Sequence, residues 1–419
     1  MAKAALLPGH GASAGVGPLA AACCIAGGGP AGMMLGYLLA RAGVPVVVLE
    51  KHADFLRDFR GDTVHPSTLQ LMHELGLLDE FLKLPHQEVR ELSIQIGQQR
   101  FKAADFTGLP TVCKFIALMP QWDLLDFLAK QGRKLKTFTL IMQAEVQGLI
   151  EADGRVLGVM ARTPDGPLEV RADLTVGADG RRSTVRAAAG LPVEDVGAPM
   201  DVLWFRLSRQ PTDDDDTFGH VEAGRLLVML NRGDYWQCAY VIPKGGNDKV
   251  RADGLEAFQA DVRRLSPFLG DRVQALDDWD KVKLLTVSID RLTQWSRPGL
   301  LCIGDAAHAM SPIGGVGINL AIQDAVAAAN RLAGPLRAGR VTMADLQAVQ
   351  RRRTLPTRLT QGAQAVIQKR LISPLLSAQG PLPVPWPLKL LDRSRLLRGI
   401  PARLVGIGVR PEHVGTPAV

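Results

Sequence analysis

The chain has 419 residues, of which 47% are hydrophobic and 22% charged, as in an ordinary globular protein, and its length predicts two or three domains. No apolar stretch approaches the roughly 18 residues that a membrane-spanning helix needs. The five cysteines are odd in number, which argues against a disulfide framework and favours a reducing, cytoplasmic location. No cysteine pair has zinc-site spacing, so no metal is expected.

The net charge of +7 is concentrated at one end of the chain. Residues 331–419 hold fifteen Lys and Arg against three Asp and Glu, a net +12, which leaves −5 for the first 330 residues. This tail lacks the interleaved aromatics of a single-strand binder, so nucleic acid is not an expected partner. Around 388–404 leucines alternate with arginines, which leaves two interpretations: peripheral membrane contact, or a helical layer packed on the rest of the chain, which we favour.

Residues 1–21 are rich in Ala and Gly, and we expect a flexible extension there rather than a secretion signal, because glycines break the apolar run. An apolar run from Cys23 to Ala26 follows, and it leads into a glycine turn. Apolar residues then recur at helical spacing, and a second apolar run covers 46–49. This pattern predicts a strand, a helix and a second strand that ends at Glu50.

The turn itself reads G-x-G-x-x-G, with Gly27, Gly29 and Gly32 at the defining positions. Glycines let the backbone approach a pyrophosphate, which free N–H groups and the positive end of the helix would hold. Glu50, eighteen residues after Gly32, is placed to accept hydrogen bonds from ribose hydroxyls and would repel a 2′-phosphate. The unit therefore predicts a site for FAD or NAD, with an ordinary glycine-rich loop as the alternative.

Two distant segments, LTVGADGRRSTVR and LLCIGDAAHAMSPIGGVGIN, carry further polar groups. In each, a predicted buried strand delivers an acid and a glycine to its carboxyl end, where open α/β sheets bind ligands. These pairs are Asp179 with Gly180, and Gly304 with Asp305. Glycines then leave bare N–H groups before a long helix that starts near Ile318, where they would stabilise negative charge on a bound group such as a reduced flavin.

Together, GGGPAG with Glu50, GADG followed by Arg186, and GDAAH with SPIGGVGIN resemble the three signatures of class A flavoprotein monooxygenases, the para-hydroxybenzoate hydroxylase-like family. The resemblance covers about residues 22–345. It implies FAD as cofactor, NADPH or NADH as a transient electron donor, and O₂. It also implies hydroxylation of a small aromatic substrate (phenolic, quinone or polyketide-like) through a flavin C4a-hydroperoxide. Many members have glutamine where Val316 stands and a second proline where Ile313 stands, which alters the flavin edge.

The implied architecture is α/β: a Rossmann-like FAD-binding domain with an inserted, mostly antiparallel β-sheet substrate domain and a C-terminal helical region. We expect the FAD-binding domain to be discontinuous, because short strand patterns at 93–118 and 199–287 interrupt it. The boundaries that we predict are 1–21 for the extension, 22–92, 119–198 and 288–345 for the FAD-binding domain, 93–118 and 199–287 for the sheet domain, and 346–419 for the helical region.

The resemblance also implies cofactor contacts at particular residues. For the ADP half these are Gly27, Gly29, Pro30, Ala31, Gly32, Glu50 and Lys51, with Arg60 and Gln121 as further FAD contacts. Asp179 and Gly180 fall at the signature linked to both FAD and the nicotinamide, and Asp305, after Gly304, is the implied ribityl ligand. The implied isoalloxazine contacts are Pro312, Gly315, Gly317, Ile318 and Asn319.

The substrate pocket is predicted from strand patterns in 200–242. Trp204 lies on one strand, and Leu227, Met229 and Asn231 share a face of another by period-2 spacing; with Pro312 they form the predicted wall, although plain core packing explains them too. His220 and His308 are the candidates for proton transfer, against the simpler interpretation of satisfied core histidines. With 5% aromatic residues the pocket is expected to be mostly aliphatic and suited to a bulky apolar ring system.

Other functions remain open at this level. A flavin-dependent dehydrogenase or reductase would use the same fold without inserting oxygen, and a non-catalytic flavin- or substrate-binding protein would keep the same signatures. A flavin halogenase is disfavoured, because the chain has no Trp-x-Trp-x-Ile-Pro stretch. The oligomeric state is not predicted by any pattern in the chain.

Overall fold

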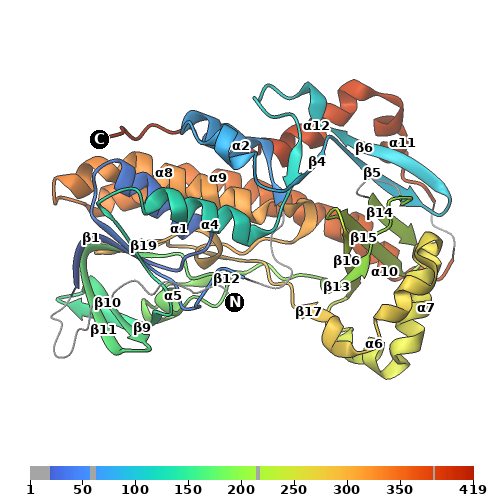
Figure 1. Cartoon of the computed structure of the whole chain (residues 1–419), viewed down its shortest axis with the longest axis horizontal. Coiled ribbons are helices and arrows are strands. Elements are labelled where there is room, and N and C mark those ends of the chain that lie inside the picture. Colours follow the sequence, from blue (N-terminus) through green and yellow to red (C-terminus); the bar gives the residue numbers. More distant parts are fainter. Residues whose placement is uncertain (1–18, 57–62, 214–217, 381–382) are drawn as a thin grey trace, which may run out of the picture.

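The structure is a computed structural model that describes residues 19–56, 63–213, 218–380 and 383–419. Figure 1 shows two sheets at opposite ends of the molecule, with the long helices α8 (Gly317–Arg337) and α9 (Met343–Ile367) extending between them. Within the described residues, no helix is both long and apolar enough to cross a membrane.

The first sheet has the strand order β19-β20-β11-β1-β2-β8, and its inner strands are parallel. Their bounds are β1 Leu19–Ala26, β2 Val46–Leu49, β8 Phe138–Ile141, β11 Gly166–Gly177, β19 Ser296–Arg297 and β20 Leu300–Cys302. The parallel order brings the carboxyl ends of β1, β11 and β20, and so all three signatures, to one edge. β1 starts at Leu19 and pairs with β11 from there, so the predicted extension 1–21 overlaps it by three residues.

Helix α1 (Pro30–Arg41) connects β1 to β2, which confirms the predicted strand, helix and strand. Its residues from Ala31 to Ala40 are all buried, because the helix packs between the sheet, α4 (Gln121–Gly132) and α8. Gly36 permits the close approach to the sheet, since a Cβ there would lie 2.7 Å from Val48 Cγ2. The surrounding helices explain why this helix is apolar on every side.

The second sheet has seven strands in the order β17-β13-β16-β15-β14-β5-β6, and only the β14–β5 pair is parallel. Their bounds are β5 Glu91–Ile96, β6 Gln99–Asp105, β13 Met200–Ser208, β14 Phe218–Glu222, β15 Arg225–Asn231, β16 Tyr235–Pro243 and β17 Lys283–Leu285. Strands from two separate stretches of sequence therefore meet in one sheet, as the α/β architecture with a mostly antiparallel insertion predicts.

Both faces of the second sheet are covered, but by different elements. One face packs on α7 (Leu255–Leu265), through residues such as Phe205 of β13 and Phe258 of the helix. The other face turns toward the first sheet's domain, where Val202 and Val241 share a cluster with Ile313 and Ile372. The period-2 alternation of the strands sorts their side chains between these two layers.

Shorter elements complete the chain between the sheets. They are β3 Thr63–Val64, β4 Gln87–Val89 and β7 Ile116–Leu118 in a three-stranded sheet, β12 Val193–Asp195 with β18 Asp290–Leu292, and β9 Glu145–Ala152 with β10 Arg155–Thr163 beside β11. The short helices are α2 Pro66–Glu74, α3 Leu78–Phe81, α5 Thr184–Ala188 and α6 Asn247–Asp253.

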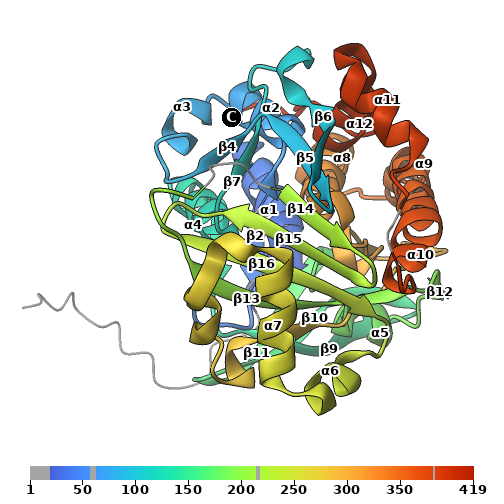
Figure 2. The ribbon, with the colours of Figure 1, turned by 90° about the vertical axis from the view of Figure 1, so that its right-hand side faces the viewer.

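The C-terminal region is helical. After α9 come a π-helical turn (Gln368–Ile372), α10 (Ser373–Leu376), α11 (Trp386–Arg393) and α12 (Arg395–Gly406). α11 and α12 pack on β6, while α9 packs on α8. In Figure 2 these helices, in orange and red, occupy the right-hand side of the molecule.

Candidate functional site

The glycine turn after β1 has the geometry of an anion-binding site. A Cβ on Gly32 would lie 1.9 Å from the Gly27 carbonyl oxygen, and one on Gly27, with φ +105°, would lie 2.4 Å from the oxygen of Ala178. Around Gly29, in contrast, no described atom lies within 4 Å of the Cβ position. No side chain caps the first turn of α1, so its N–H groups and its positive dipole end face this open space. The site therefore fits a pyrophosphate.

Glu50 stands at the end of β2, beside this turn. Its carboxylate is 6% exposed and accepts hydrogen bonds from the N–H groups of Gly28 and His52, both at 3.0 Å. These bonds orient the acid at the adenosine side of the turn. Lys51 follows it and is exposed, while Gln121 is the half-buried first residue of α4. Arg60 lies outside the residues that the structure describes.

Asp179, the acid of the middle signature, is hydrogen-bonded to nearby residues and does not point freely into the site. Asp179 accepts hydrogen bonds from the Ser183 hydroxyl at 2.5 Å and from the Val185 N–H at 3.1 Å, and so closes the start of α5. Burial raises the pKa of Asp179, and these hydrogen bonds oppose that rise. Next to it, Gly180 has φ +84° and no heavy atom within 4 Å of its Cβ position. The open position of this signature is therefore the glycine.

Asp305 joins the middle signature to the third. Arg181 Nε donates to its Oδ2 at 3.2 Å, and the two side chains are 30% and 32% exposed. A half-exposed ion pair is weak, so Asp305 can exchange this partner for hydroxyl groups of a ligand. Arg186 is held away from the edge by Asp290 at 3.2 Å and by the Arg181 carbonyl at 2.7 Å.

The loop that precedes α8 bears a second uncapped helix N-terminus. Gly314 and Gly315 have φ +77° and +62°, and α8 starts at Gly317 with no side-chain cap. Pro312 and Ile318 are half-buried, so this loop presents both backbone N–H groups and apolar side chains. It fits the negatively charged edge of a flat ring system.

Asn319, predicted as a cofactor contact, is engaged inside the protein. Its Oδ1 accepts from the His65 N–H at 2.9 Å and from Thr68 Oγ1 at 2.7 Å, and its Nδ2 donates to the Thr63 carbonyl at 3.2 Å. Thr63 Oγ1 in turn donates to the Gly315 carbonyl at 3.0 Å. Asn319 therefore ties the loop to β3 and α2 from a position only 5% exposed.

Three buried glutamines, two on α9 and one at the start of the π-helical turn that follows it, hold the other side of this loop. Gln361 Nε2 donates to the Ala309 carbonyl at 3.0 Å, and Gln368 Nε2 to Ser311 Oγ at 2.8 Å. Gln364 bonds the loop three times: it accepts from Ser311 N–H and donates to the carbonyls of Ser311 and Ile313. The spacing of three and four residues places them on one face of the helix. Sequence reasoning missed them, although this spacing was a signal.

His65 is a further group that the sequence did not single out. It is fully buried, and its Nδ1 lies 2.7 Å from the Val405 carbonyl of α12, so Nδ1 carries the proton. Burial lowers the pKa of His65 to about 4. Its Nε2 has no partner among the described residues. His65 thus connects two regions: its backbone N–H binds Asn319 behind the α8 loop, and its neutral imidazole binds α12.

His308 belongs to a buried ion network and has no exposed edge. Its Nε2 lies 2.6 Å from Asp324 Oδ2, while the other oxygen accepts from Arg353 Nε at 2.9 Å. The same Asp324 also accepts from the Gly304 N–H at 3.0 Å, and Arg353 reaches Glu412 at 3.3 Å. Burial alone raises the pKa of Asp324, but His308 and Arg353 lower it below its usual value. The network fastens the third signature to the C-terminal tail.

The second proton-transfer candidate, His220, is also a buried residue. It lies on β14 and is 6% exposed. Burial first, and the charge of Arg100 second, lower the pKa of His220 to about 4. Both histidines therefore fit the core interpretation, and we assign no catalytic acid or base.

The predicted substrate wall requires a correction at β15. Leu227 and Met229 are fully buried in the core under α7, on the sheet face away from Ile313, and Asn231 Oδ1 accepts from the Gly233 N–H at 2.9 Å. The period-2 pattern grouped these side chains correctly but did not say which face meets the loop. Trp204 does lie on the loop side. Its half-buried apolar neighbours there are Leu226, Val228, Leu285, Ile313 and Leu376.

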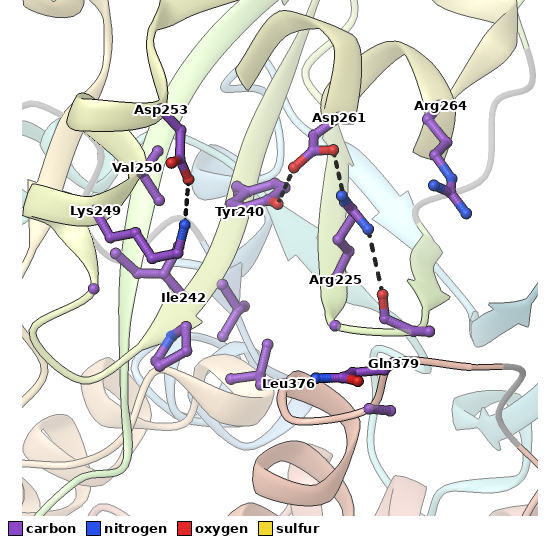
Figure 3. A pocket seen from close by; sticks show the side chains of 16 residues that line it. Arg225, Tyr240, Ile242, Lys249, Val250, Asp253, Asp261, Arg264, Leu376 and Gln379 are labelled. Carbon is purple, nitrogen blue, oxygen red and sulfur yellow. Dashed lines mark hydrogen bonds and ion pairs between the residues drawn. The ribbon is translucent and has the colours of Figure 1, made fainter. Parts of the chain in front are cut away.

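A separate pocket of about 590 Å³ lies between α6, α7 and α10, and no residue of the three signatures lines it. Figure 3 shows Asp261 between Tyr240, which donates at 3.1 Å, and Arg225, at 2.7 Å. Lys249 pairs with Asp253 at 2.6 Å. A fifth charged lining residue, Arg264, pairs with Glu222 outside the pocket at 2.8 Å, so each charged side chain that lines this pocket in the described part of the chain has an ionic partner.

Comparison with known proteins agrees with this site. The FAD binding domain family matches residues 20–363. The 6-methylpretetramide 4-monooxygenase of Streptomyces rimosus is 34% identical over 352 residues, 84% of either chain. The 12-dehydrotetracycline 5-monooxygenase/anhydrotetracycline 6-monooxygenase of the same species is 26% identical over 72% of this chain, which spans only 60% of that longer protein.

Solved structures share the fold. PqsL of Pseudomonas aeruginosa, in complex with 2-aminobenzoylacetate, superposes with a TM-score of 0.74 at 22% identity and covers 85% of this chain and 98% of its own. The anhydrotetracycline hydroxylase of Streptomyces rimosus gives 0.70 at 22% identity, with 95% and 78% covered. The chain therefore belongs to the FAD-binding-domain family and is a FAD-dependent monooxygenase of the class A, para-hydroxybenzoate hydroxylase-like group.

Proposed function

We propose that this enzyme hydroxylates a flat, polycyclic, polyketide-like aromatic substrate at the expense of NADPH or NADH and O₂. The observation that carries the proposal is the half-buried apolar layer opposite the α8 loop, where Trp204 and Val228 of the sheet face Ile313. Charged groups border this layer on the same sheet face, because Lys283 of β17 lies directly opposite Trp204 and Arg206 follows two residues along β13. The apolar centre of the layer suits a bulky ring system.

The relatives support the same substrate class. One acts, by its name, on 6-methylpretetramide and another on anhydrotetracycline, and the first of them matches 84% of this chain. Within the layer, the Trp204 indole N–H has no hydrogen-bond partner among the described residues. We propose that it donates to a carbonyl or phenol oxygen of the substrate and so orients the ring.

The cofactor fits the two uncapped helix ends. The turn at 27–32 with Glu50 would hold the ADP half, Asp305 the ribityl chain, and the N-terminus of α8 the charged edge of the flavin. FAD supplies the hydride acceptance and oxygen activation when it is bound. The chain's own contribution is to position the substrate, stabilise charge and exclude water with Trp204 and Ile313. We propose that NADPH or NADH binds only transiently, as the electron donor.

The decisive experiment measures NADPH oxidation, O₂ uptake and the oxygen content of the product in the same reaction. Purified enzyme should show a bound flavin spectrum, and a polycyclic phenol should stimulate both NADPH consumption and O₂ uptake, with one oxygen atom gained by the product. Trp204→Phe removes the N–H and leaves a smaller aromatic ring, so the substrate KM should rise about tenfold. Trp386→Phe, at an exposed position, is the matched control.

Other outcomes select the alternatives. Hydride transfer that runs equally well without O₂, with no oxygen in the product, identifies a dehydrogenase or reductase. Purified protein without flavin absorbance and without turnover identifies a binding protein. Preference for a small carboxylated phenol over the polycyclic one overturns the substrate class alone.

We also propose the cytoplasm as its compartment. All five cysteines are free and buried, which suits a reducing environment. Labelling of the protein in fractionated cells tests this location directly.

A further inference from the structure

The C-terminal helices carry a second apolar face, separate from the one with which they pack. Of the eighteen exposed large hydrophobic side chains among the described residues, ten lie between α9 and α12. These ten are Leu355, Leu359, Val366, Ile367, Leu371, Trp386, Leu390, Leu396, Ile400 and Leu404. We call the surface that they form the C-terminal face.

The inward packing of these helices uses other residues. α12 lies on the sheet side through Ala402 and Gly406, and α11 buries Leu388. α9 buries Leu346 and Val349. Because the core contacts are made elsewhere, burial against the protein does not account for the ten exposed side chains.

The exposed side chains follow helical spacing and so form stripes. On α12, Leu396, Ile400 and Leu404 are four residues apart and 88%, 58% and 54% exposed. On α9, Leu355 and Leu359 share a stripe at the same spacing. On α11, Trp386 is 75% exposed and stands four residues before Leu390. Figure 2 places α9, α10, α11 and α12 on one side of the molecule.

Cations accompany the stripes and acids are nearly missing. Residues 346–411 contain twelve Lys and Arg but one acid, Asp392. The exposed cations among them are Arg351, Arg358, Lys369, Arg370, Lys389, Arg393, Arg395, Arg403 and Arg410. Apolar stripes with exposed tryptophan, flanked by lysine and arginine, have the composition of helices that lie in the interface of an anionic bilayer.

We propose that the C-terminal face docks peripherally on an anionic lipid bilayer. Charge favours a bilayer over a second copy of the chain. An isologous contact would set these cations against their own copies, and residues 346–411 of each copy offer only Asp392 to offset them. An anionic bilayer complements the cations and takes up the apolar side chains, including Trp386. The proposal is independent of the substrate.

Vesicle binding of the full, FAD-loaded enzyme tests the proposal. Sedimentation with phosphatidylcholine vesicles that contain phosphatidylglycerol should retain the protein, high salt should release it, and pure phosphatidylcholine should bind it at least tenfold more weakly. Brominated acyl chains should quench Trp386, the one exposed tryptophan of the six, and Trp386→Phe should abolish that quenching.

Two variants and a control separate docking from folding. Leu396→Glu with Ile400→Glu should reduce partitioning roughly tenfold or more, as should Lys369→Gln with Arg370→Gln. The control, Leu284→Glu, changes a 44%-exposed leucine on β17 and should bind as the parent does. NADPH oxidation by each variant shows that it is folded.

Three results would overturn the proposal: no binding to phosphatidylglycerol vesicles, equal binding to neutral vesicles, or equal loss in the Leu284 control. A dimer in sedimentation velocity that the Leu396 variant dissociates, without vesicle binding, would assign the face to a second copy instead. Failure of hydroxylase activity with normal vesicle binding would leave this proposal standing and reject the proposed function alone.

Discussion

The two uncapped helix ends of the site, at α1 and at α8, have the same electrostatic character but are built in different ways. The end at α1 comes from one continuous stretch, in which Gly27 and Gly32 touch each other and the neighbouring strand loop. The end at α8 is held by residues far away in sequence: His65 lies 254 positions from Asn319, and Gln364 belongs to another helix. One end is set by steric fit and the other by hydrogen bonds.

This difference matters for function. A sterically determined turn has one shape and suits a group that never varies, as the proposed pyrophosphate would be. A loop that several separate elements hold can be adjusted by any of them, and it stands where a ring system and its substrate would meet. The predictions below test each mode of construction, from the largest expected effect to the smallest.

Gly32→Ala should have the largest effect. Its Cβ would lie 1.9 Å from the Gly27 carbonyl oxygen, so the turn must open, and we expect loss of FAD binding and a fall of more than about 4 kcal/mol in the free energy of unfolding. FAD absorbance of the purified protein and urea unfolding measure the two effects.

Gly29→Ala is the matched control. The position has φ −74° and no described atom within 4 Å of its Cβ, so the fold should keep its stability within about 0.5 kcal/mol. The affinity for FAD should nevertheless fall about tenfold, because the methyl group enters the space left for the pyrophosphate. Equal destabilisation by both substitutions would refute steric construction of this end.

Asp324→Asn tests the network behind the second end. The change leaves Arg353, which is 1% exposed, with Glu412 at 3.3 Å as its remaining charged partner, and we expect the free energy of unfolding to fall by about 3 kcal/mol. Asp253→Asn, in the exposed pair with Lys249, should cost less than about 0.5 kcal/mol. Urea unfolding measures the loss in both variants. Similar losses would mean that the buried network stabilises the fold no more than an exposed ion pair does.

His65 should make the second end sensitive to acid. Its pKa is about 4 in the folded protein against 6.5 ordinarily, so between these values the unfolded chain binds a proton that the native state does not. The free energy of unfolding therefore keeps its full value above about pH 6.5. It decreases as the pH falls from 6.5 to about 4, because only the unfolded chain takes up the proton in that range. We expect a loss of about 2 kcal/mol from pH 7 to pH 5.

The variant His65→Asn should remove that part of the pH dependence. His73→Asn, on the exposed face of α2, serves as the control and should leave the dependence as it is in the parent. Urea unfolding at several pH values measures it. If the free energy of unfolding of both variants depends on pH as in the parent, His65 is not the group responsible for the acid sensitivity.

Gln364→Leu should have the smallest effect on stability but a specific one on the cofactor. It removes three hydrogen bonds to Ser311 and Ile313, at a cost of about 1 to 2 kcal/mol. Because these bonds hold the loop that we propose lies beside the flavin, the FAD dissociation constant and the flavin absorption maximum should both change. Gln347→Leu, exposed on the same helix, should change neither, and an unaltered flavin spectrum in the Gln364 variant would disprove the positioning role.

Particular elements show how far sequence reasoning reached. The strand, helix and strand of 19–49 followed from glycine positions and apolar spacing, apart from residues 19–22, the first four of β1. The antiparallel second sheet followed from strand patterns, and the α/β architecture from the family resemblance. Leu227 and Met229 did not, because period-2 spacing groups side chains by face but cannot say whether α7 or the α8 loop covers that face.

The sequence by itself determined the glycine turn after β1, since close backbone contact at Gly27 and Gly32 admits no other residue and leaves a recognisable motif. Only the tertiary structure decided how the α8 loop is held, which sheet face packs against it, and that His308 and Asn319 are hydrogen-bonded inside the protein. The physical reason is distance along the chain. Steric rules act between neighbours and appear as spacing, whereas hydrogen bonds between Gln364, His65 and this loop exist only after separate elements have packed together.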